Sequence, residues 1–263
     1  MYPEIHLGPL TLQTFGLMFA LAFLAAGALI ARRLGEIGKP VDWAYEIGFA
    51  ALLGGIVGSR VYFIVQNYDS VKDDLLGNLF SGSGLVWYGG AIGGALAVVA
   101  WAWYRGFLGL ALLDLAAPAL ALGYAVGRCG CQLSGDGDYG KPWDGPWAMS
   151  YPDGTVPTDR TVHPTPIYET LAMGLGAWIL WQLRDRFRAG VLFAAYLVYA
   201  GAERFLVEFL RRNDQVALGL TTAQLESLAM ILVGVAWIVA VQRRHGTLSA
   251  MASTKPIQPV AGS

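Results

Sequence analysis

Charged residues are scarce in this 263-residue sequence: Asp, Glu, Lys and Arg make up 14% of it, against about 25% in a typical soluble domain. The formal net charge is -1, so no basic surface favours a nucleic acid partner.

Cysteine is limited to Cys129 and Cys131. A disulfide between residues two positions apart would be strained, so we expect free thiols. Two thiols alone are a weak metal site, and we predict neither a metal nor a cofactor.

Hydrophobic residues, in contrast, make up 55% of the chain, and the mean hydropathy is +0.48. Several apolar runs are long enough to cross a hydrocarbon core of about 30 Å, which takes about 20 helical residues. We therefore predict an all-α, polytopic membrane protein. Its seven transmembrane helices are expected at residues 13–31, 43–65, 84–104, 108–127, 166–183, 189–209 and 221–241.

Basic residues follow the odd-numbered spans, and such residues favour the cytoplasmic side of a membrane. No Lys or Arg precedes the first span, so it does not resemble a cleaved signal peptide. We expect the N-terminus outside and the C-terminus in the cytoplasm. The pair Arg211 and Arg212 does not fit this pattern, because it follows the sixth span on the predicted outer side. That pair needs a separate explanation.

The domain organisation is predicted to be simple. Residues 1–245 form one transmembrane domain, with an outer loop at 128–165 between spans four and five. Residues 246–263 are rich in Ser, Ala and Pro and are expected to form a disordered cytoplasmic tail. Glycines such as Gly54, Gly58, Gly89 and Gly93 recur inside the spans. Small residues at this spacing allow membrane helices to approach closely.

Charged groups inside membrane helices are costly and usually face a cavity or a partner. Six of them are candidates for a functional site: Arg60, Arg128, Glu169, Arg204, Glu208 and Arg211. The last three are spaced i, i+4 and i+7, so they share one helix face and Glu208 can pair with either arginine. We expect a cavity with more cations than carboxylates. Such a cavity suits a phosphodiester, because the guanidinium fork matches phosphate oxygens; the alternative is a set of structural ion pairs.

Weaker candidates lie near the predicted outer helix ends. His163 precedes span five, and a single histidine can equally be a hydrogen-bonded structural residue. Tyr88 begins span three, where aromatic side chains commonly anchor a helix at the membrane interface. Asp136 and Asp138 flank a glycine in the outer loop. The other ligands of a calcium loop are missing, so we do not predict calcium.

These residues belong to seven motifs that, in this order, resemble the prolipoprotein diacylglyceryl transferases of bacterial inner membranes over most of the chain. The motifs are Thr14-Phe15-Gly16-Leu17, Gly58-Ser59-Arg60, Tyr88-Gly89-Gly90, Gly127-Arg128-Cys129-Gly130 continuing to Gly140, Pro146-Trp147-Ala148-Met149, His163-Pro164 with Tyr168-Glu169, and Arg204-Phe205 with Val207-Glu208-Phe209 and Arg211.

The resemblance implies a multi-pass inner-membrane transferase. It would move the sn-1,2-diacylglyceryl group of phosphatidylglycerol to the lipobox cysteine thiol of a preprolipoprotein and release glycerol phosphate. The implied catalytic residues are Arg128 and Arg204 at the phosphate, Tyr88 or Asp136 at the thiol proton, and Glu169. The implied substrate-binding residues are Arg60, Arg128, Gly89, Gly90, Gly140, Glu208, Arg211 and His163.

The chain departs from the family pattern at three positions. Tyr88 replaces a histidine proposed as the catalytic base, Cys131 replaces an asparagine, and Phe15 replaces a tyrosine. The reference pKa of tyrosine is about 10, against about 6.5 for histidine, so Tyr88 would be a weak base unless nearby cations lower its pKa. Two alternatives follow: a divergent member that uses another acceptor, and a phospholipid-binding membrane protein without catalysis.

Overall fold

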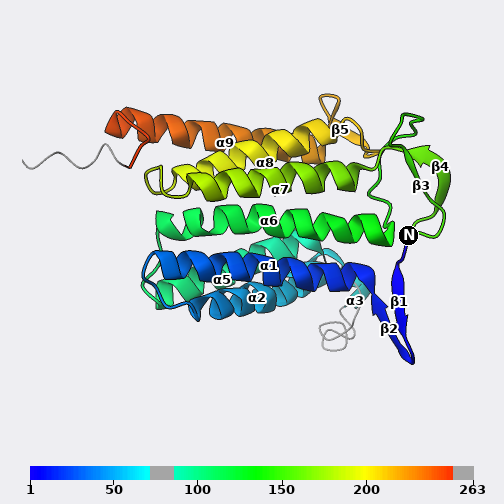
Figure 1. The fold of residues 1–263 in the computed structure, drawn as a ribbon, viewed down its shortest axis with the longest axis horizontal. Helices are drawn as coiled ribbons and strands as arrows, with labels where there is room; N and C mark the ends of the chain where they lie inside the picture. Colours follow the sequence, from blue (N-terminus) through cyan, green and yellow to red (C-terminus); the bar gives the residue numbers. More distant parts are fainter. Residues whose placement is uncertain (72–85, 251–263) are drawn as a thin grey trace, which may run out of the picture. The chain divides into compact units, whose positions relative to one another are not determined.

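A computed structural model describes residues 1–71 and 86–250 (Figure 1). The chain forms two compact units, Met1–Ala26 with the residues from Leu113 onward, and Gly27–Leu112. Long helices lie at all seven predicted positions: α1 (Thr14–Glu36), α2 (Trp43–Gln66), α5 (Trp87–Tyr104), α6 (Leu110–Ser134), α7 (Thr165–Leu183), α8 (Val191–Val207) and α9 (Thr222–His245). A short helix, α3 (Tyr68–Val71), follows α2. The first two residues of predicted span 84–104 lie outside the described residues. The helical framework is confirmed.

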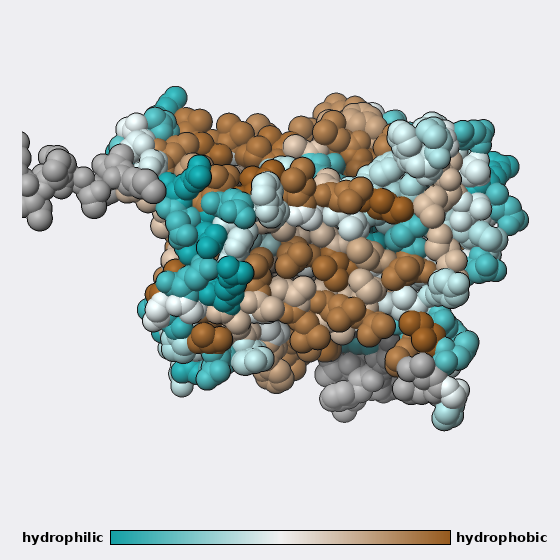
Figure 2. Space-filling model, in the orientation of Figure 1, coloured by the Kyte–Doolittle hydropathy of each residue, from teal (hydrophilic) through white to brown (hydrophobic). Residues whose placement is uncertain are grey.

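Membrane character is visible in both helix length and surface. Among the described helices, α1, α2, α6 and α9 are long and apolar enough to cross a membrane by length and composition. Large apolar side chains are exposed on α7, at Leu171 and Trp178, and on α9, at Leu232 and Val233. Figure 2 shows apolar residues along α9. An exposed apolar surface of this kind suits contact with lipid.

Three small antiparallel sheets were not predicted, so the all-α prediction is correct only for the framework. They pair β1 (Glu4–Leu7) with β2 (Leu10–Gln13), β3 (Met149–Tyr151) with β4 (Thr158–Val162), and β5 (Gln215–Ala217) with β6 (Leu220–Thr221). In the last hairpin, Ala217 pairs with Leu220, and Leu218 and Gly219 between them have φ of 55° and 71°. Positive φ at both turn residues matches the right-handed twist of two-residue hairpins.

The outer loop starts later than predicted, because α6 continues to Ser134. Arg128 and both cysteines are therefore helical. Gly130, inside the predicted loop, serves helix packing: a Cβ there would lie 3.0 Å from the Cβ of Met18 on α1. The helix ends at Gly135, which has a φ of 60°, a conformation that favours glycine.

The core of the first unit joins α6, α7 and α8. Its buried apolar residues are Ala117, Ala121, Ala125, Met173, Ala177, Leu180 and Leu192. Asp114 on α6 accepts hydrogen bonds from the backbone N–H groups of Gly190 (2.7 Å) and Phe193 (2.9 Å). A carboxylate there satisfies free donors at the start of α8 and complements its dipole. The next helix, α9, begins with a capping box between Thr221 and Gln224.

The second unit is built on close contact between α2 and α5. A Cβ at Gly58 would lie 2.7 Å from the Cα of Gly93, and a Cβ at Gly93 would lie 2.7 Å from the Cα of Gly58. The predicted role of these glycines in helix packing is thus confirmed. The pairing is extended by the hydroxyl of Ser59, which donates to the carbonyl of Val86 at 2.9 Å.

The first residues of the predicted tail contact the turn between α7 and α8. The backbone N–H of Arg188 donates to Leu248 O (2.9 Å), and that of Ala250 donates to Arg186 O (3.1 Å). These residues at the start of the predicted tail thus form backbone hydrogen bonds to the turn between α7 and α8. Residues 251–263 lie outside the described part of the chain.

Candidate functional site

Glu169 on α7 is fully buried at the centre of a group of arginines in the first unit. Its Oε1 lies 3.2 Å from Arg128 Nη2 and 3.7 Å from Arg204 Nη1. Its Oε2 lies 3.5 Å from Arg211 Nη1. The hydroxyl of Tyr124 donates to Oε1 at 2.8 Å. A buried carboxylate requires partners of this kind, and here one carboxylate fixes arginines from three different segments.

Glu208 is the second buried carboxylate of the group. Its Oε2 lies 2.7 Å from Arg204 Nη1 and 3.8 Å from Arg211 Nε. The predicted pairing along one face is confirmed, and it involves both arginines. Its Oε1 accepts from the hydroxyl of Thr221 (2.9 Å) and the amide of Asn213 (2.7 Å). Because Thr221 caps α9, Glu208 also connects the end of α8 to the start of α9.

Asp138, in the loop after α6, supplies the third carboxylate. It accepts hydrogen bonds from Arg128 and from Arg211. Its backbone carbonyl accepts from the hydroxyl of Thr165 at 2.6 Å, which fixes the loop to the start of α7. Burial alone would raise the pKa of Asp138, but the two guanidinium groups outweigh it and lower that pKa below the usual 3.8. Asp138 is therefore a charged clamp on two arginines.

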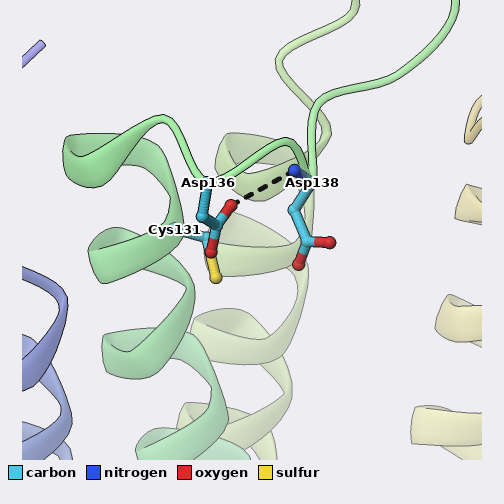
Figure 3. Close-up of side chains that lie close together, drawn as sticks. All are labelled: Cys131, Asp136 and Asp138. Atoms are coloured by element: carbon cyan, nitrogen blue, oxygen red, sulfur yellow. Dashed lines mark hydrogen bonds between the residues drawn. The ribbon is translucent and has the colours of Figure 1, made fainter. Parts of the chain in front are cut away.

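Asp136, which we expected at the catalytic centre, forms no ion pair with these arginines in the described structure. One of its carboxylate oxygens accepts from the backbone N–H of Asp138 at 3.2 Å (Figure 3). The sequence pattern, with one aspartate on each side of a glycine, did not distinguish the two. The tertiary structure assigns the contact with arginine to Asp138.

Cys131, Asp136 and Asp138 bring potential metal ligands together. Their sulfur and carboxylate oxygens lie within 4.8 Å of one another (Figure 3). However, Asp138 is bound to two arginines, and Arg128 Nη1 lies 3.7 Å from the sulfur of Cys131. Positive charge at this distance disfavours a metal cation. Both cysteines are free thiols, as predicted.

The ion-paired network contains three arginines and three carboxylates: Arg128, Arg204, Arg211, Asp138, Glu169 and Glu208. The predicted excess of cations is therefore wrong for this network. The difference arises from Asp138, because the sequence did not show that the loop returns its carboxylate to the arginines. The side chains of Arg128 and Arg204 keep 15% and 22% of their surface exposed, whereas Glu169 and Glu208 keep none. Asp138 keeps 32% and Arg211 keeps 9%. Arg128 and Arg204 are thus the more accessible of the three arginines.

Four predicted site residues, Arg60, Tyr88, Gly89 and Gly90, lie in the second unit. Arg60 is buried within α2. Tyr88 is 43% exposed, and its ring packs edge-on against Trp87. Gly89 is required for helix packing, because a Cβ there would lie 3.0 Å from the Cα of Ser59. Gly90 is less confined: the nearest atom to a Cβ there would be the Gly55 carbonyl oxygen, at 3.5 Å.

His163 and Gly140 organise the loop in front of α7. The ring of His163 stacks on Trp143, with 4.4 Å between centroids, and its Nδ1 lies 3.3 Å from the hydroxyl of Tyr168. Burial lowers the pKa of His163. The backbone N–H of Gly140 donates to His163 O at 2.8 Å, and a Cβ at Gly140 would lie 2.9 Å from the Cβ of His163. These contacts favour the structural interpretation of both residues.

Sequence reasoning missed Tyr124 and Glu203. Tyr124 accepts a hydrogen bond from Arg128 Nη2 at 2.9 Å and donates one to Glu169, so it bridges two members of the network. Its i, i+4 spacing to Arg128 was an available signal. Glu203 on α8 is partly buried and interacts electrostatically with Glu169 and Arg204. A carboxylate inside a predicted membrane helix is itself a signal.

Comparison with known proteins gives a consistent result. The sequence model of the family described as "Prolipoprotein diacylglyceryl transferase" matches residues 4–240. Relatives named "Phosphatidylglycerol--prolipoprotein diacylglyceryl transferase" include one from Clostridium tetani, 33% identical over 86% of this chain and 92% of its own length. Another, from Methylobacillus flagellatus, is 33% identical over 92% of this chain and 96% of its own. A third, from Vibrio parahaemolyticus, is 34% identical over 91% of this chain and 90% of its own length.

Proposed function

This chain belongs to the prolipoprotein diacylglyceryl transferase family, and on that basis we propose that it transfers the diacylglyceryl group of phosphatidylglycerol to the lipobox cysteine of a preprolipoprotein. The names of its relatives support the donor and the acceptor. The observation that carries the proposal is the convergence of Arg128 and Arg204 on one oxygen of Glu169. Two guanidinium groups from different helices are thereby held at one point.

The reaction exchanges a carbon–oxygen bond for a carbon–sulfur bond. The thiolate sulfur attacks the primary glyceryl carbon next to the phosphate, and the carbon–oxygen bond to the phosphate breaks. The electron pair of that bond leaves with the phosphate oxygen. The thiol proton passes to a base. The products are a thioether-linked lipid and glycerol phosphate, so the negative charge on the departing phosphate increases during the reaction.

Arg128 and Arg204 are proposed to bind the phosphate and to stabilise the leaving oxygen. Both are fixed by buried carboxylates while part of each side chain stays exposed. Prearranged cations at a site where negative charge develops are among the largest contributions to catalysis. Glu169, Glu208 and Arg211 are proposed to hold these guanidinium groups in position. Asp138, which fixes Arg128 from the loop, is added to that supporting set.

The base remains a choice between Tyr88, Asp136 and a thiolate that arrives already ionised. Tyr88→Phe removes the only titratable group of that side chain, so an unchanged transfer rate would eliminate it. Tyr88→His restores the residue typical of the family and should raise the rate at neutral pH if a base at this position limits transfer. Both variants are compared at equal protein concentration across pH 6 to 9.

The membrane arrangement is proposed together with the activity. All seven long helices would cross a bacterial inner membrane, with the N-terminus outside and the C-terminus in the cytoplasm. Four helices that are apolar and long enough support crossing, and the basic residues after the odd-numbered helices support the orientation. Cysteine-labelling of engineered positions at the β1–β2 hairpin and in the 246–250 segment, in intact cells, tests the sidedness.

The decisive experiment for function is transfer by the purified protein in liposomes. The donor is phosphatidylglycerol labelled in its acyl chains, and the acceptors are a lipobox peptide and the same peptide with cysteine changed to serine. We expect label on the cysteine peptide alone. Arg128→Gln should reduce the rate by about 100-fold or more, whereas Arg160→Gln, at an exposed position of β4, should retain it. Absence of label on both peptides with the wild-type protein would refute the proposal.

A further inference from the structure

Arg211 and Arg212 are adjacent in the turn that follows α8, and their side chains make different contacts. Arg211 is buried, with 8% of its surface exposed, and it pairs with Asp138, Glu169 and Glu208. Arg212 is exposed. Its guanidinium carbon lies 4.4 Å from the centroid of the Tyr139 ring, and its Nη2 donates to Gly137 O at 3.4 Å. Of the two arginines that did not fit the predicted charge pattern, Arg211 thus pairs with the buried carboxylates. Arg212 contacts an aromatic ring and a backbone carbonyl instead.

Arg212 carries charge that no carboxylate balances within the described part of the chain. Asp138, the carboxylate that lines the same pocket, is bound to Arg128 and Arg211. The aromatic ring of Tyr139 and one carbonyl oxygen hold the guanidinium group in place. Neither contact neutralises a cation as a carboxylate does. Arg212 therefore provides the positive charge that the neutral network lacks.

Arg212 lines a pocket of about 380 Å³ whose other lining residues are Gly137, Asp138, Tyr139, Arg211 and Asn213. Cavities of about 300 to 1,000 Å³ are the usual size of small-molecule sites. The lining contains two arginines and one aspartate, and Arg211 extends from this pocket to Glu169. The pocket is thus polar, positively charged and directly adjacent to the network.

We propose that this pocket binds the glycerol phosphate released by the transfer reaction, with Arg212 as its principal anion contact. The proposal rests on the proposed function for the identity of the anion. Phosphatidylglycerol carries one negative charge on its phosphodiester, and the released phosphate monoester carries about 1.5 to 2 at pH 7. Within the described residues, each of the three arginines of the network is already paired with at least one carboxylate. Arg212, next to Arg211 in the chain, supplies a further cation and draws the product away from the reacting carbon.

The shared chemistry of substrate and product is a glycerophosphate group, so the test must separate the two. Isothermal titration calorimetry measures binding of glycerol phosphate and of the soluble diester glycerophosphoglycerol to the full-length protein in detergent. We expect the wild-type protein to bind the monoester more tightly than the diester. The preference should increase as the pH rises through about 6, where the monoester loses its second proton.

Arg212→Gln keeps much of the side chain and removes its charge, so it should weaken monoester binding by about tenfold or more. The matched variant Arg160→Gln, at an exposed position of β4, should bind as the wild type does. Equal monoester affinity in Arg212→Gln and wild type, or no measurable binding to the wild type, would overturn the proposal. Tighter binding of the diester that is lost in Arg212→Gln would overturn it as well, because the pocket would then serve the phospholipid head group.

The binding measurement is independent of the transfer assay, so the two proposals can fail separately. A protein that transfers diacylglyceryl groups but binds no glycerol phosphate through Arg212 retains its proposed function and lacks this site. A protein that binds glycerol phosphate through Arg212 without transfer retains the site and lacks the function.

Discussion

The two aspartates of the outer loop provide the sharpest test of the site. Asp138→Asn preserves the size of the side chain but removes the negative charge that holds Arg128 and Arg211. Asp136→Asn is the matched control, because Asp136 lies two residues away and accepts from a backbone N–H instead. The two variants are chemically identical changes. Of the two aspartates, Asp138 is the one with ion pairs to arginines in the described structure.

The magnitude follows from the contacts. A hydrogen bond to a charged group contributes about 1.5 to 3 kcal/mol, and Asp138 accepts from two guanidinium groups. Its side chain retains 32% exposure, so solvent screening places the expected loss near the low end, at about 3 kcal/mol in total. If that energy is what aligns Arg128 with the phosphate, the transfer rate should fall by about 100-fold, because each 1.36 kcal/mol corresponds to a factor of ten. Asp136→Asn should change the rate by less than about fivefold.

The assay is the initial rate of diacylglyceryl transfer to a lipobox peptide, with thermal unfolding of each variant measured in the same detergent. A pH series adds a second readout. The lowered pKa of Asp138 means that its stabilising charge is fully present above about pH 4. This contribution is lost only as the pH falls further, through the folded-state pKa. The wild type should therefore lose stability on acidification in that range, and Asp138→Asn should lose less.

Greater loss of activity in Asp136→Asn than in Asp138→Asn would contradict the assignment of Asp138 as the carboxylate that holds Arg128 and Arg211. It would return Asp136 to the role of base. Equal, small effects in both variants would show that Arg128 is positioned by Glu169 and Tyr124 without help from the loop.

Three further substitutions test the packing on which the site depends. Glu169→Gln leaves three buried or partly buried arginines without their shared carboxylate and should cost about 3 to 5 kcal/mol of stability. The expected sign is a large drop in thermal unfolding temperature. An unchanged unfolding temperature would show that Glu169 is not the centre of the network. Gly140→Ala places a methyl group against the backbone and should lower the stability by about 1 to 3 kcal/mol. Gly109→Ala places its Cβ in open space and should not destabilise the protein. Gly58→Ala should separate α2 from α5 and reduce the yield of folded protein from detergent extraction, while Gly48→Ala, also in open space on α2, should leave the yield unchanged.

Much of the fold could be predicted from sequence because the signals are local. Apolar runs of sufficient length predicted all seven helices. The glycine spacing predicted close helix packing, which α2 and α5 show. The i, i+4, i+7 spacing predicted that Glu208 pairs with arginines of its own segment, since helix geometry alone brings such side chains together. The short hairpins were missed, because strands of two to five residues carry little periodic signal.

The sequence by itself determined which helices form, which family motifs the chain carries and which charged residues lie in apolar segments. Only the tertiary structure decided how those charges combine. The loop after α6 returns Asp138, not Asp136, to Arg128 and Arg211, and this contact makes the network neutral. The same loop leaves Arg212 beside an open pocket. The physical reason is that periodicity fixes neighbours within one helix, whereas pairing between a loop and several helices depends on the whole path of the chain.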